Sequence, residues 1–367
     1  MSPEVTMTKN PLKEVLKLGQ SIWYDGLVSR EAFSRLIEED GIRGATTNPT
    51  IFEKAIAAGE YDKVIADLRY KGDPSTSSGR ATEFIYRHLA GETVQGVCDT
   101  FLPVFKESNG EDGFVSIEVS PLLAYDTQKT IAEAKELHQL VNRENVMIKV
   151  PATAQGIPAI ETLIAEGISV NITLIFSNER YAEVMEAYLR GLEKRVKAGK
   201  SVASIASVAS FFVSRVDAAI DARLQDRALK GEAAIANSKI AYKNFKKFFS
   251  GERFQKLKKL GAKAQRPLWA STGTKSADYS DVLYVESLIG PETVNTIPPP
   301  TLAAFKDHGR AALTLEKGQE KAQSILTRLA KEGIDLSFVT KDLETKGVEL
   351  FVDSYKKIIE RLEARLK

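Results

Sequence analysis

Short apolar runs rich in β-branched residues alternate along the chain with longer segments of helical periodicity. Several of these runs are nearly continuous in apolar and small residues, which is typical of strands covered on both faces of a parallel sheet. Strands that alternate with helices indicate βαβ units. The pattern predicts eight strands, at residues 21–26, 44–49, 114–121, 146–151, 169–177, 206–216, 266–274 and 293–301.

The segments between the predicted strands have the spacing of amphipathic helices. After the fifth strand, apolar residues form one helical stripe, with Ser177 suited to cap its start and Gly199 as a stop signal. Eight strand–helix units favour a closed barrel over an open doubly wound sheet. The chain also lacks the GxGxxG and Walker motifs of open-sheet nucleotide sites. We therefore predict an α/β fold, a (β/α)8 TIM barrel.

The chain is longer than the about 250 residues of a typical (β/α)8 barrel, so additional helices are expected. We predict a single domain over 1–367, with its barrel core at about 21–310. The additional helices lie before the core, between the second and third strands, in an insertion at about 225–265, and at the C-terminus, about 311–367. The insertion is locally basic with phenylalanines on one side. Because the whole chain is nearly neutral, a helix packed on the barrel is favoured there over a nucleic-acid or membrane-surface helix.

Composition and charge exclude several classes of protein. The 367 residues are 43% hydrophobic and 27% charged, as in ordinary globular proteins, and a formal net charge of +2 gives no bulk attraction to nucleic acid or membrane. Cys98 is the single cysteine, so no intramolecular disulfide can form. We see no signal peptide and no membrane span, and expect a cytoplasmic protein. The three histidines lack the spacing of a zinc site, so no metal is predicted.

The most informative candidate for chemistry is Lys149, in the apolar run VMIKVP. Active sites of (β/α)8 barrels lie at the C-terminal ends of the strands, and lysines are rarely buried without a partner or a function. An inward lysine is desolvated, which favours the neutral amine that attacks carbonyl groups. Strand context alone equally allows an outward lysine or a structural ion pair. Glu118, in VSIEVSP, is either a structural partner of Lys149 or a proton relay through water.

Other polar residues fall at comparable places in successive strands. Each alone has an ordinary interpretation: Asp25 as a strand-end cap, Asn48 before a proline as turn chemistry, and Thr173 as a β-branched strand residue. Their shared position at strand ends makes the set stronger than its members. The remaining candidates are Asn171, Ser210, Arg215, Ser271 and Lys275.

Four sequence blocks, occurring in order, resemble the transaldolases of the class I aldolase superfamily. The blocks are GATTNPTIF, SIEVSPLLAYDT, NVMIKVPATAQGIPAIETLIAEGISVNITLIFS and ASFFVSRVD. The resemblance extends from roughly Ile22 to the region of Pro298. The chain length and the segment IPPPTLAAF are similar to the longer bacterial subfamily.

This resemblance implies a catalytic set. Lys149 would form a Schiff base with the ketose, and Glu118 with Thr173 would hold the water that shuttles protons during imine formation. Asp25 would be the general acid/base that takes the proton of the C4 hydroxyl as the C3–C4 bond breaks. The imine delocalises the charge of the three-carbon fragment, so no metal or cofactor is implied.

The resemblance also implies a set of substrate-binding residues. Asn48 and Asn171 would hold the three-carbon fragment, Phe212 would shape the pocket, and Ser210 and Arg215 would line the pocket and grip the phosphate. Many members have an arginine in the block after the seventh strand, where this chain reads WASTGTKS. In that block we predict phosphate contacts from Ser271 and Lys275.

The implied function is transfer of a dihydroxyacetone unit in the non-oxidative pentose phosphate pathway. Donors would be sedoheptulose 7-phosphate or fructose 6-phosphate, and acceptors glyceraldehyde 3-phosphate or erythrose 4-phosphate. The alternatives are a fructose-6-phosphate-type class I aldolase and an inactive sugar-phosphate-binding barrel. Glu118 favours transfer, because aldolase relatives tend to have glutamine there. A sugar-phosphate isomerase would need a histidine at a strand end, and none is found. Sugar phosphates are the only partners implied, and a homo-oligomer is left open.

Overall fold

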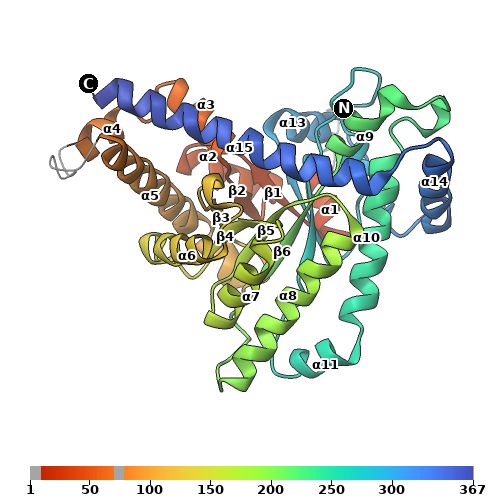
Figure 1. Cartoon of the computed structure of the whole chain (residues 1–367), viewed down its shortest axis with the longest axis horizontal. Helices are drawn as coiled ribbons and strands as arrows, with labels where there is room; N and C mark the ends of the chain where they lie inside the picture. The colour runs from red at the N-terminus through yellow and green to blue at the C-terminus, as the bar shows by residue number, and fades with distance from the viewer. Residues whose placement is uncertain (1–9, 70–77, 367) are drawn as a thin grey trace, which may run out of the picture.

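Eight parallel strands close into one barrel in the computed structural model, which describes residues 10–69 and 78–366. Each strand pairs with its neighbours in sequence, and the last pairs with the first. The predicted (β/α)8 TIM barrel and all eight predicted strands are confirmed (Figure 1). The strands are β1 (Gln20–Asp25), β2 (Gly44–Thr46), β3 (Val115–Glu118), β4 (Val146–Pro151), β5 (Val170–Ile175), β6 (Ser207–Phe212), β7 (Arg266–Ala270) and β8 (Thr293–Ile297).

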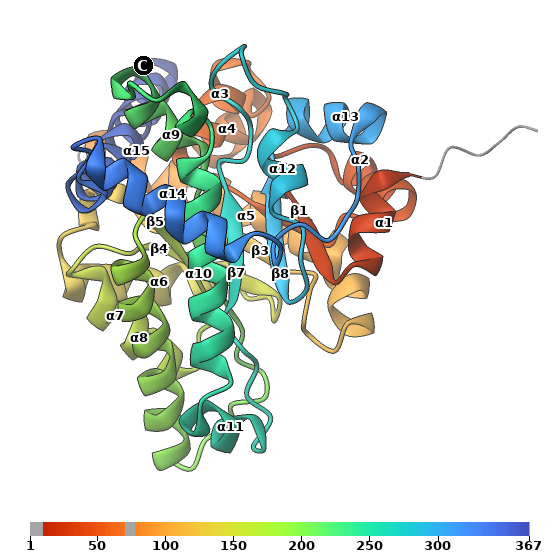
Figure 2. The same cartoon turned by 90° about the vertical axis from the view of Figure 1, so that its right-hand side faces the viewer.

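Helices surround the barrel and connect consecutive strands (Figure 2). The strands are buried almost throughout, as expected for a parallel barrel covered by helices. The helices are α1 (Pro11–Lys17), α2 (Arg30–Arg35), α3 (Pro49–Ala57), α4 (Asp62–Arg69), α5 (Ser78–Glu107), α6 (Thr127–Val141), α7 (Gly156–Glu166), α8 (Asn178–Lys197), α9 (Ser214–Ile220), α10 (Ala233–Phe249), α11 (Glu252–Lys258), α12 (Leu283–Ser287), α13 (Pro299–His308), α14 (Gln319–Lys331) and α15 (Leu336–Leu366).

The sequence signals for α8 correspond to its observed ends. The Ser177 side chain accepts a hydrogen bond from the backbone N–H of Arg180, which satisfies one of the free N–H groups of the first turn. Gly199 follows the helix with φ +70°, a left-handed conformation that glycine adopts without steric cost. The predicted start and stop of this helix are therefore confirmed.

Helices beyond the eight strand–helix units occur in three parts of the chain: before β1, between β2 and β3, and after β8. Helix α1 precedes β1 and packs on it, and α4 and the long α5 extend the connection between β2 and β3. After β8, α14 packs on α10, and α15 crosses the barrel mouth to reach α3 and α5. In Figure 1 this last helix, dark blue, runs along the upper edge of the molecule.

The segment 225–265 contains the connection that the barrel itself needs between β6 and β7. Helix α10 lies there beside α8 and contacts β7, so the range that we predicted as an insertion includes the crossover helix of this unit. Phe245, Phe249 and Phe254 are buried, so the apolar side of the segment packs against the protein. Several of its basic residues pair with acids, such as Arg253 with Glu186 at 3.0 Å.

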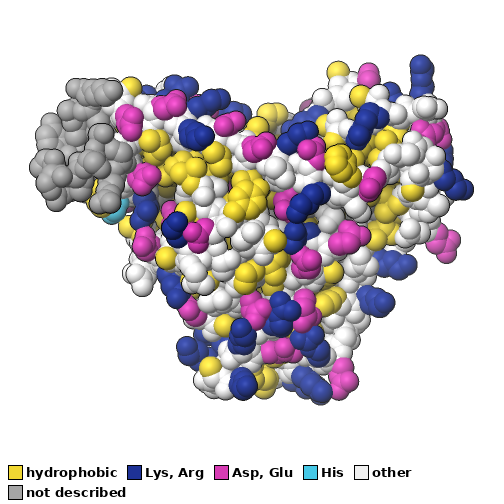
Figure 3. Space-filling model, viewed as in Figure 1, with side chains coloured by type: hydrophobic (Ala, Val, Ile, Leu, Met, Phe, Trp, Pro, Cys, Tyr) yellow, Lys and Arg dark blue, Asp and Glu magenta, His cyan; other side chains and the backbone are white. Residues whose placement is uncertain are grey.

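Positive and negative side chains are interspersed over the face drawn in Figure 3. Such a mixed surface provides no broad field of one sign to attract a polyanion on that face. Among the described helices, none is both long enough and apolar enough to span a membrane.

Candidate active site

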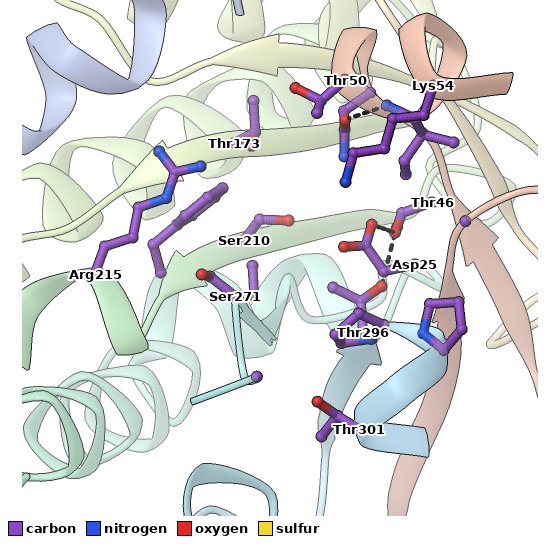
Figure 4. A pocket seen from close by; sticks show the side chains of 18 of the residues that line it. Asp25, Thr46, Thr50, Lys54, Thr173, Ser210, Arg215, Ser271, Thr296 and Thr301 are labelled. Carbon is purple, nitrogen blue, oxygen red and sulfur yellow. Dashed lines mark hydrogen bonds between the residues drawn. The ribbon is translucent and has the colours of Figure 1, made fainter. Parts of the chain in front are cut away.

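A cavity of about 750 Å³ opens at the C-terminal ends of the strands, where barrel enzymes place their active sites. Helix α3, the start of α9, the segment after β7 and helix α15 complete its walls. Figure 4 shows polar side chains converging on this space from several strands and from α3. Nine of the eleven predicted site residues line it: Asp25, Asn48, Lys149, Thr173, Ser210, Phe212, Arg215, Ser271 and Lys275.

Lys149 points into the barrel mouth and is almost completely buried. Its Nζ donates a hydrogen bond to the backbone oxygen of Thr47 at 3.2 Å and lies 3.3 Å from Glu118 Oε2. The two charged side chains are only 6% and 5% exposed, and they sit side by side because β3 and β4 pair Glu118 with Lys149 in register. The outward orientation that the sequence allowed is therefore wrong, and the ion pair is present.

Glu118 lies behind Lys149 and does not line the main cavity. Burial raises the pKa of its carboxyl group, and the adjacent Lys149 opposes that rise. Within the described residues, Glu118 Oε2 and the Oγ1 of buried Thr173 have no hydrogen-bond partner. Their strands, β3 and β5, flank β4, so two unsatisfied oxygens lie on either side of the lysine strand. Buried polar atoms of this kind are commonly satisfied by ordered water.

Asn171 lies beneath the cavity floor. It pairs in register with Lys149, yet its side chain is fully buried, donating to Ser116 Oγ at 2.9 Å and accepting from Ser210 Oγ at 2.7 Å. A direct contact of Asn171 with a three-carbon fragment stays a prediction. In this structure its visible role is to fix the hydroxyl group of Ser210, which does reach the cavity.

Asp25 ends β1 and faces the cavity opposite Arg215 (Figure 4). Burial raises the pKa of its carboxyl group, while the charge of Lys149 and a hydrogen bond from Thr46 lower it again. The Thr46 Oγ1 to Asp25 Oδ1 distance is 2.8 Å. The acid is thus poised to change protonation more readily than an exposed aspartate, as a general acid/base must.

Asn48 starts helix α3 and combines local turn chemistry with access to the cavity. Its Oδ1 accepts from the backbone N–H of Ile51 at 3.0 Å, with Pro49 at the first helical position. The predicted turn role is therefore confirmed. Its amide nitrogen has no partner within the described chain and is free to donate to a ligand in the cavity.

Arg215 enters the cavity from α9 at the end of β6. Its guanidinium lies 5.3 Å from the centre of the Phe212 ring, a cation–π contact that holds the side chain in place. Desolvation lowers the Arg215 pKa, and the charge of Asp25 raises it. After β7, Ser271 adopts φ +55°. Its backbone oxygen accepts a 3.0 Å hydrogen bond from the backbone N–H of Ser214, which holds this conformation. Strained backbone of this kind is common where a ligand is bound.

Lys54 is a cavity residue that the sequence did not reveal. It lies six positions after Asn48 on α3, and its ammonium group projects into the cavity on the side opposite Arg215 (Figure 4). Partial desolvation lowers the pKa of Lys275, and the nearby charges of Arg215 and Lys54 lower it further. Within the described chain, none of the three cations forms a hydrogen bond or an ion pair with protein, so all three are available to an anion.

No group of three potential metal ligands gathers anywhere in residues 10–69 and 78–366. The site is instead a buried lysine with an adjacent carboxylate, a second carboxylate across the cavity and three free cations. A nucleophilic lysine at the mouth of a (β/α)8 barrel defines a class of enzymes that act on carbonyl compounds through a Schiff base. The free cations indicate that the carbonyl compound carries a phosphate.

Comparison with known proteins identifies the family. The family model described as Transaldolase/Fructose-6-phosphate aldolase matches residues 22–362. "Transaldolase 2" of a Nostoc species is 44% identical over 382 residues, covering 98% of this chain and 99% of the relative. Proteins named "Transaldolase" from Mycolicibacterium paratuberculosis and Mycobacterium tuberculosis are 46% and 44% identical, each covering 98% of both chains. The chain belongs to the transaldolase/fructose-6-phosphate aldolase family.

Proposed function

We propose that this protein is a transaldolase of the non-oxidative pentose phosphate pathway. It moves a dihydroxyacetone unit from a ketose phosphate to an aldose phosphate through a Schiff base on Lys149. The single observation that carries the mechanism is the buried Lys149 at the C-terminal end of β4, paired with Glu118 and open to the cavity. The names and identities of the relatives support transfer as the overall reaction.

The first half of the reaction forms the imine and cleaves the donor. The Lys149 amine adds to the C2 carbonyl of the ketose, and the carbinolamine loses water to give the iminium ion. A water held between Glu118 Oε2, which is ion-paired with Lys149, and Thr173 Oγ1 carries the protons for this step. The Asp25 carboxylate takes the proton of the C4 hydroxyl as the C3–C4 bond breaks. The bonding electrons pass to the iminium nitrogen, which leaves an enamine on Lys149 and releases an aldose phosphate.

The second half reverses these steps with a different aldehyde. The enamine carbon attacks the carbonyl of the acceptor, and Asp25 returns its proton to the oxygen that becomes the C4 hydroxyl. Water then adds to the new iminium ion and the C–N bond breaks, which releases the ketose product and restores the free amine of Lys149. Asn48 orients the three-carbon fragment through its free amide nitrogen, and Ser210 offers a hydroxyl group from the cavity floor.

The phosphate of donor and acceptor is held by the cations at the outer part of the cavity. Arg215 supplies a planar fork suited to two phosphate oxygens, and its position is fixed by Phe212. Lys275, Lys54 and the hydroxyl group of Ser271 complete the pocket. Because the phosphate is far from the reacting carbons, these contacts supply binding energy and orientation for the sugar chain.

Borohydride trapping tests the mechanism directly. The protein is mixed with fructose 6-phosphate, reduced with borohydride, digested and analysed by peptide mass. We expect a reduced dihydroxyacetone adduct on the Lys149 peptide, absent in Lys149→Ala and retained in Lys263→Ala. Lys263 is a suitable control because it is partly buried but donates to the backbone oxygens of Asn109 and Gly110, away from the cavity. A folded protein with no adduct on any lysine would overturn the nucleophile assignment.

Turnover separates transfer from simple cleavage. With fructose 6-phosphate and erythrose 4-phosphate together, a transaldolase forms sedoheptulose 7-phosphate, and an aldolase releases free dihydroxyacetone. An adduct at Lys149 with no transfer product would move the assignment to the aldolase branch of the same family. Absence of both the adduct and turnover would leave a sugar-phosphate-binding barrel.

A further inference from the structure

The C-terminal helix α15 is a 31-residue element beyond the eight strand–helix units, and it contacts the barrel near the cavity. It packs against α3, α5 and α9 and reaches β5 (Figure 1). A helix that served only to cover apolar surface could do so anywhere on the outside of the barrel. This helix instead contributes Leu350 and Phe351 to the cavity wall.

Close packing fixes the position of α15 over β5. Gly347 lies against Leu174, and a Cβ atom at that glycine would come within 2.9 Å of Leu174 Cδ2. Leu174 itself has φ +59°, at an irregularity in the pairing of β5 with β6. Leu174 directly follows Thr173, so the strand segment that lines the site is also the segment on which the helix packs.

Polar contacts also tie α15 to helix α3. The hydroxyl groups of Thr50 and Ser354 are 2.8 Å apart, and Arg361 Nε lies 3.2 Å from Glu53 Oε1. Gly347, Ser354 and Arg361 are spread over four turns of the helix. The residues between the first two are therefore held against the cavity from both sides.

Phe351 lies between these anchor points and covers the lysine. Its ring centre is 5.9 Å from Lys149 Nζ, and the residue is only 4% exposed. Leu350, next to it, is 47% exposed and forms the outer rim. The phenyl ring is thus an apolar wall of the compartment in which a lysine-bound intermediate forms.

We infer that Phe351 shields the lysine-bound enamine from water and so directs it to an aldose acceptor. This inference rests on the proposed function. After the first aldose has left, the enamine has two fates. It can attack an aldehyde, or its nucleophilic carbon can take a proton from solvent to give an iminium ion. Water then adds at C2, and the C–N bond breaks to release dihydroxyacetone and the Lys149 amine.

Solvent protonation requires water or a buffer acid at the nucleophilic carbon, whereas attack on the acceptor does not. An apolar wall above the amine lowers the local water content. It leaves room for the phosphate-bearing sugar, because Arg215 and Lys54 line other walls of the same cavity. Phe351 is accordingly a residue that sets specificity between transfer and hydrolysis, and it takes no part in proton transfer.

The test compares Phe351→Ala, Phe351→Leu and Phe338→Ala in the presence of fructose 6-phosphate and a fixed concentration of erythrose 4-phosphate. Phe338 is the control on the same helix, because it is 68% exposed and does not line the cavity. The measured quantity is the ratio of free dihydroxyacetone to transfer product. We expect Phe351→Ala to raise this ratio by roughly tenfold, the effect of a change of about 1.4 kcal/mol in relative barriers. Phe351→Leu, which keeps an apolar side chain, should lie between wild type and Phe351→Ala, and Phe338→Ala should stay close to wild type.

A second readout shows that release follows protonation of the enamine carbon. In D2O, the dihydroxyacetone released by Phe351→Ala should carry deuterium on the carbon that was bonded to C4. The inference would be overturned if Phe351→Ala and Phe351→Leu lost transfer and release equally, with the ratio of the two products unchanged. Phe351 would then be a residue that serves only the packing of α15. Because every arm includes the wild-type enzyme, a failure of the proposed function appears separately, as absence of the borohydride adduct and of transfer in wild type.

Discussion

The cation cluster around the outer cavity makes the sharpest prediction about substrate choice. Lys54 and Arg215 face each other across the cavity, and neither has an acidic partner in the described chain. We expect Lys54→Met and Arg215→Met to weaken use of phosphorylated acceptors. Their effect on unphosphorylated acceptors should be small, because such acceptors have no phosphate for these cations to hold.

The structure also predicts which substitution costs more. A hydrogen bond to a charged group contributes about 1.5–3 kcal/mol, which corresponds to roughly 10- to 150-fold in binding. Arg215 is partly desolvated and held by Phe212, so its loss should fall near the upper end of this range. Lys54 is exposed on α3, where solvent and salt screen its charge, so its loss should be about tenfold and should shrink at high ionic strength.

The assay is kcat/KM for erythrose 4-phosphate and for erythrose, each with fructose 6-phosphate as donor. Lys135→Met is the matched control, because Lys135 lies on the outer helix α6 and pairs with Glu166. The reasoning predicts that the ratio of the two kcat/KM values falls in Lys54→Met and Arg215→Met but not in the control. Equal losses for both acceptors would refute a phosphate role for these side chains.

Three further predictions concern single groups. Thr46→Val removes a hydrogen bond that lowers the pKa of Asp25, so this pKa should rise. The acid limb of the pH profile of kcat/KM should then move to higher pH. An unchanged acid limb would argue against Asp25 as the titrating base. Glu118→Gln should slow formation of the borohydride-trapped adduct by roughly 100-fold or more, as for loss of a general acid/base, and an unchanged trapping rate would remove Glu118 from the mechanism. Burial raises the pKa of Asp217 from 3.8 to about 7. Between these two pKa values the folded state binds more protons than the unfolded state. The free energy of unfolding therefore decreases as the pH rises from 3.8 to about 7. Urea unfolding of Asp217→Asn should lack this decrease, which is at most about 4 kcal/mol, and a variant with the wild-type slope would show that another group is responsible.

The strands and most of the site could be predicted because the barrel converts sequence position into spatial position. Residues near the ends of consecutive parallel strands meet at one rim, so Asp25, Lys149 and Ser210 converge although they are far apart in the chain. The contact of Glu118 with Lys149 follows in the same way from the register of β3 and β4. Strand position does not determine how deep in the barrel a side chain lies below the cavity. Asn171 is in register with Lys149, yet it lies under the cavity floor, where its amide is engaged by Ser116 of β3 and Ser210 of β6.

Lys54 and Phe351 escaped prediction because they are on helices and not at strand ends. A lysine on an amphipathic helix normally faces solvent, and nothing in the spacing of α3 distinguishes Lys54 from such a residue. The only local clue is that Asn48 caps α3 at the cavity, so the first turns of this helix must lie along the rim. Phe351 has no local clue at all, since its contact with Lys149 depends on the path of the chain after the barrel is complete.

These two residues belong to helices that are joined to each other. The Thr50–Ser354 and Glu53–Arg361 contacts tie α3 to α15, and α3 carries both Asn48 and Lys54. The cover over the lysine and one wall of the phosphate pocket are therefore built from two helices that pack on each other. The place of Phe351 beside the amine depends on the same helix that presents Asn48 and Lys54 to the ligand. The water-poor compartment and the phosphate pocket are in this way parts of one packed unit, and a water-poor compartment is the condition under which transfer competes with hydrolysis.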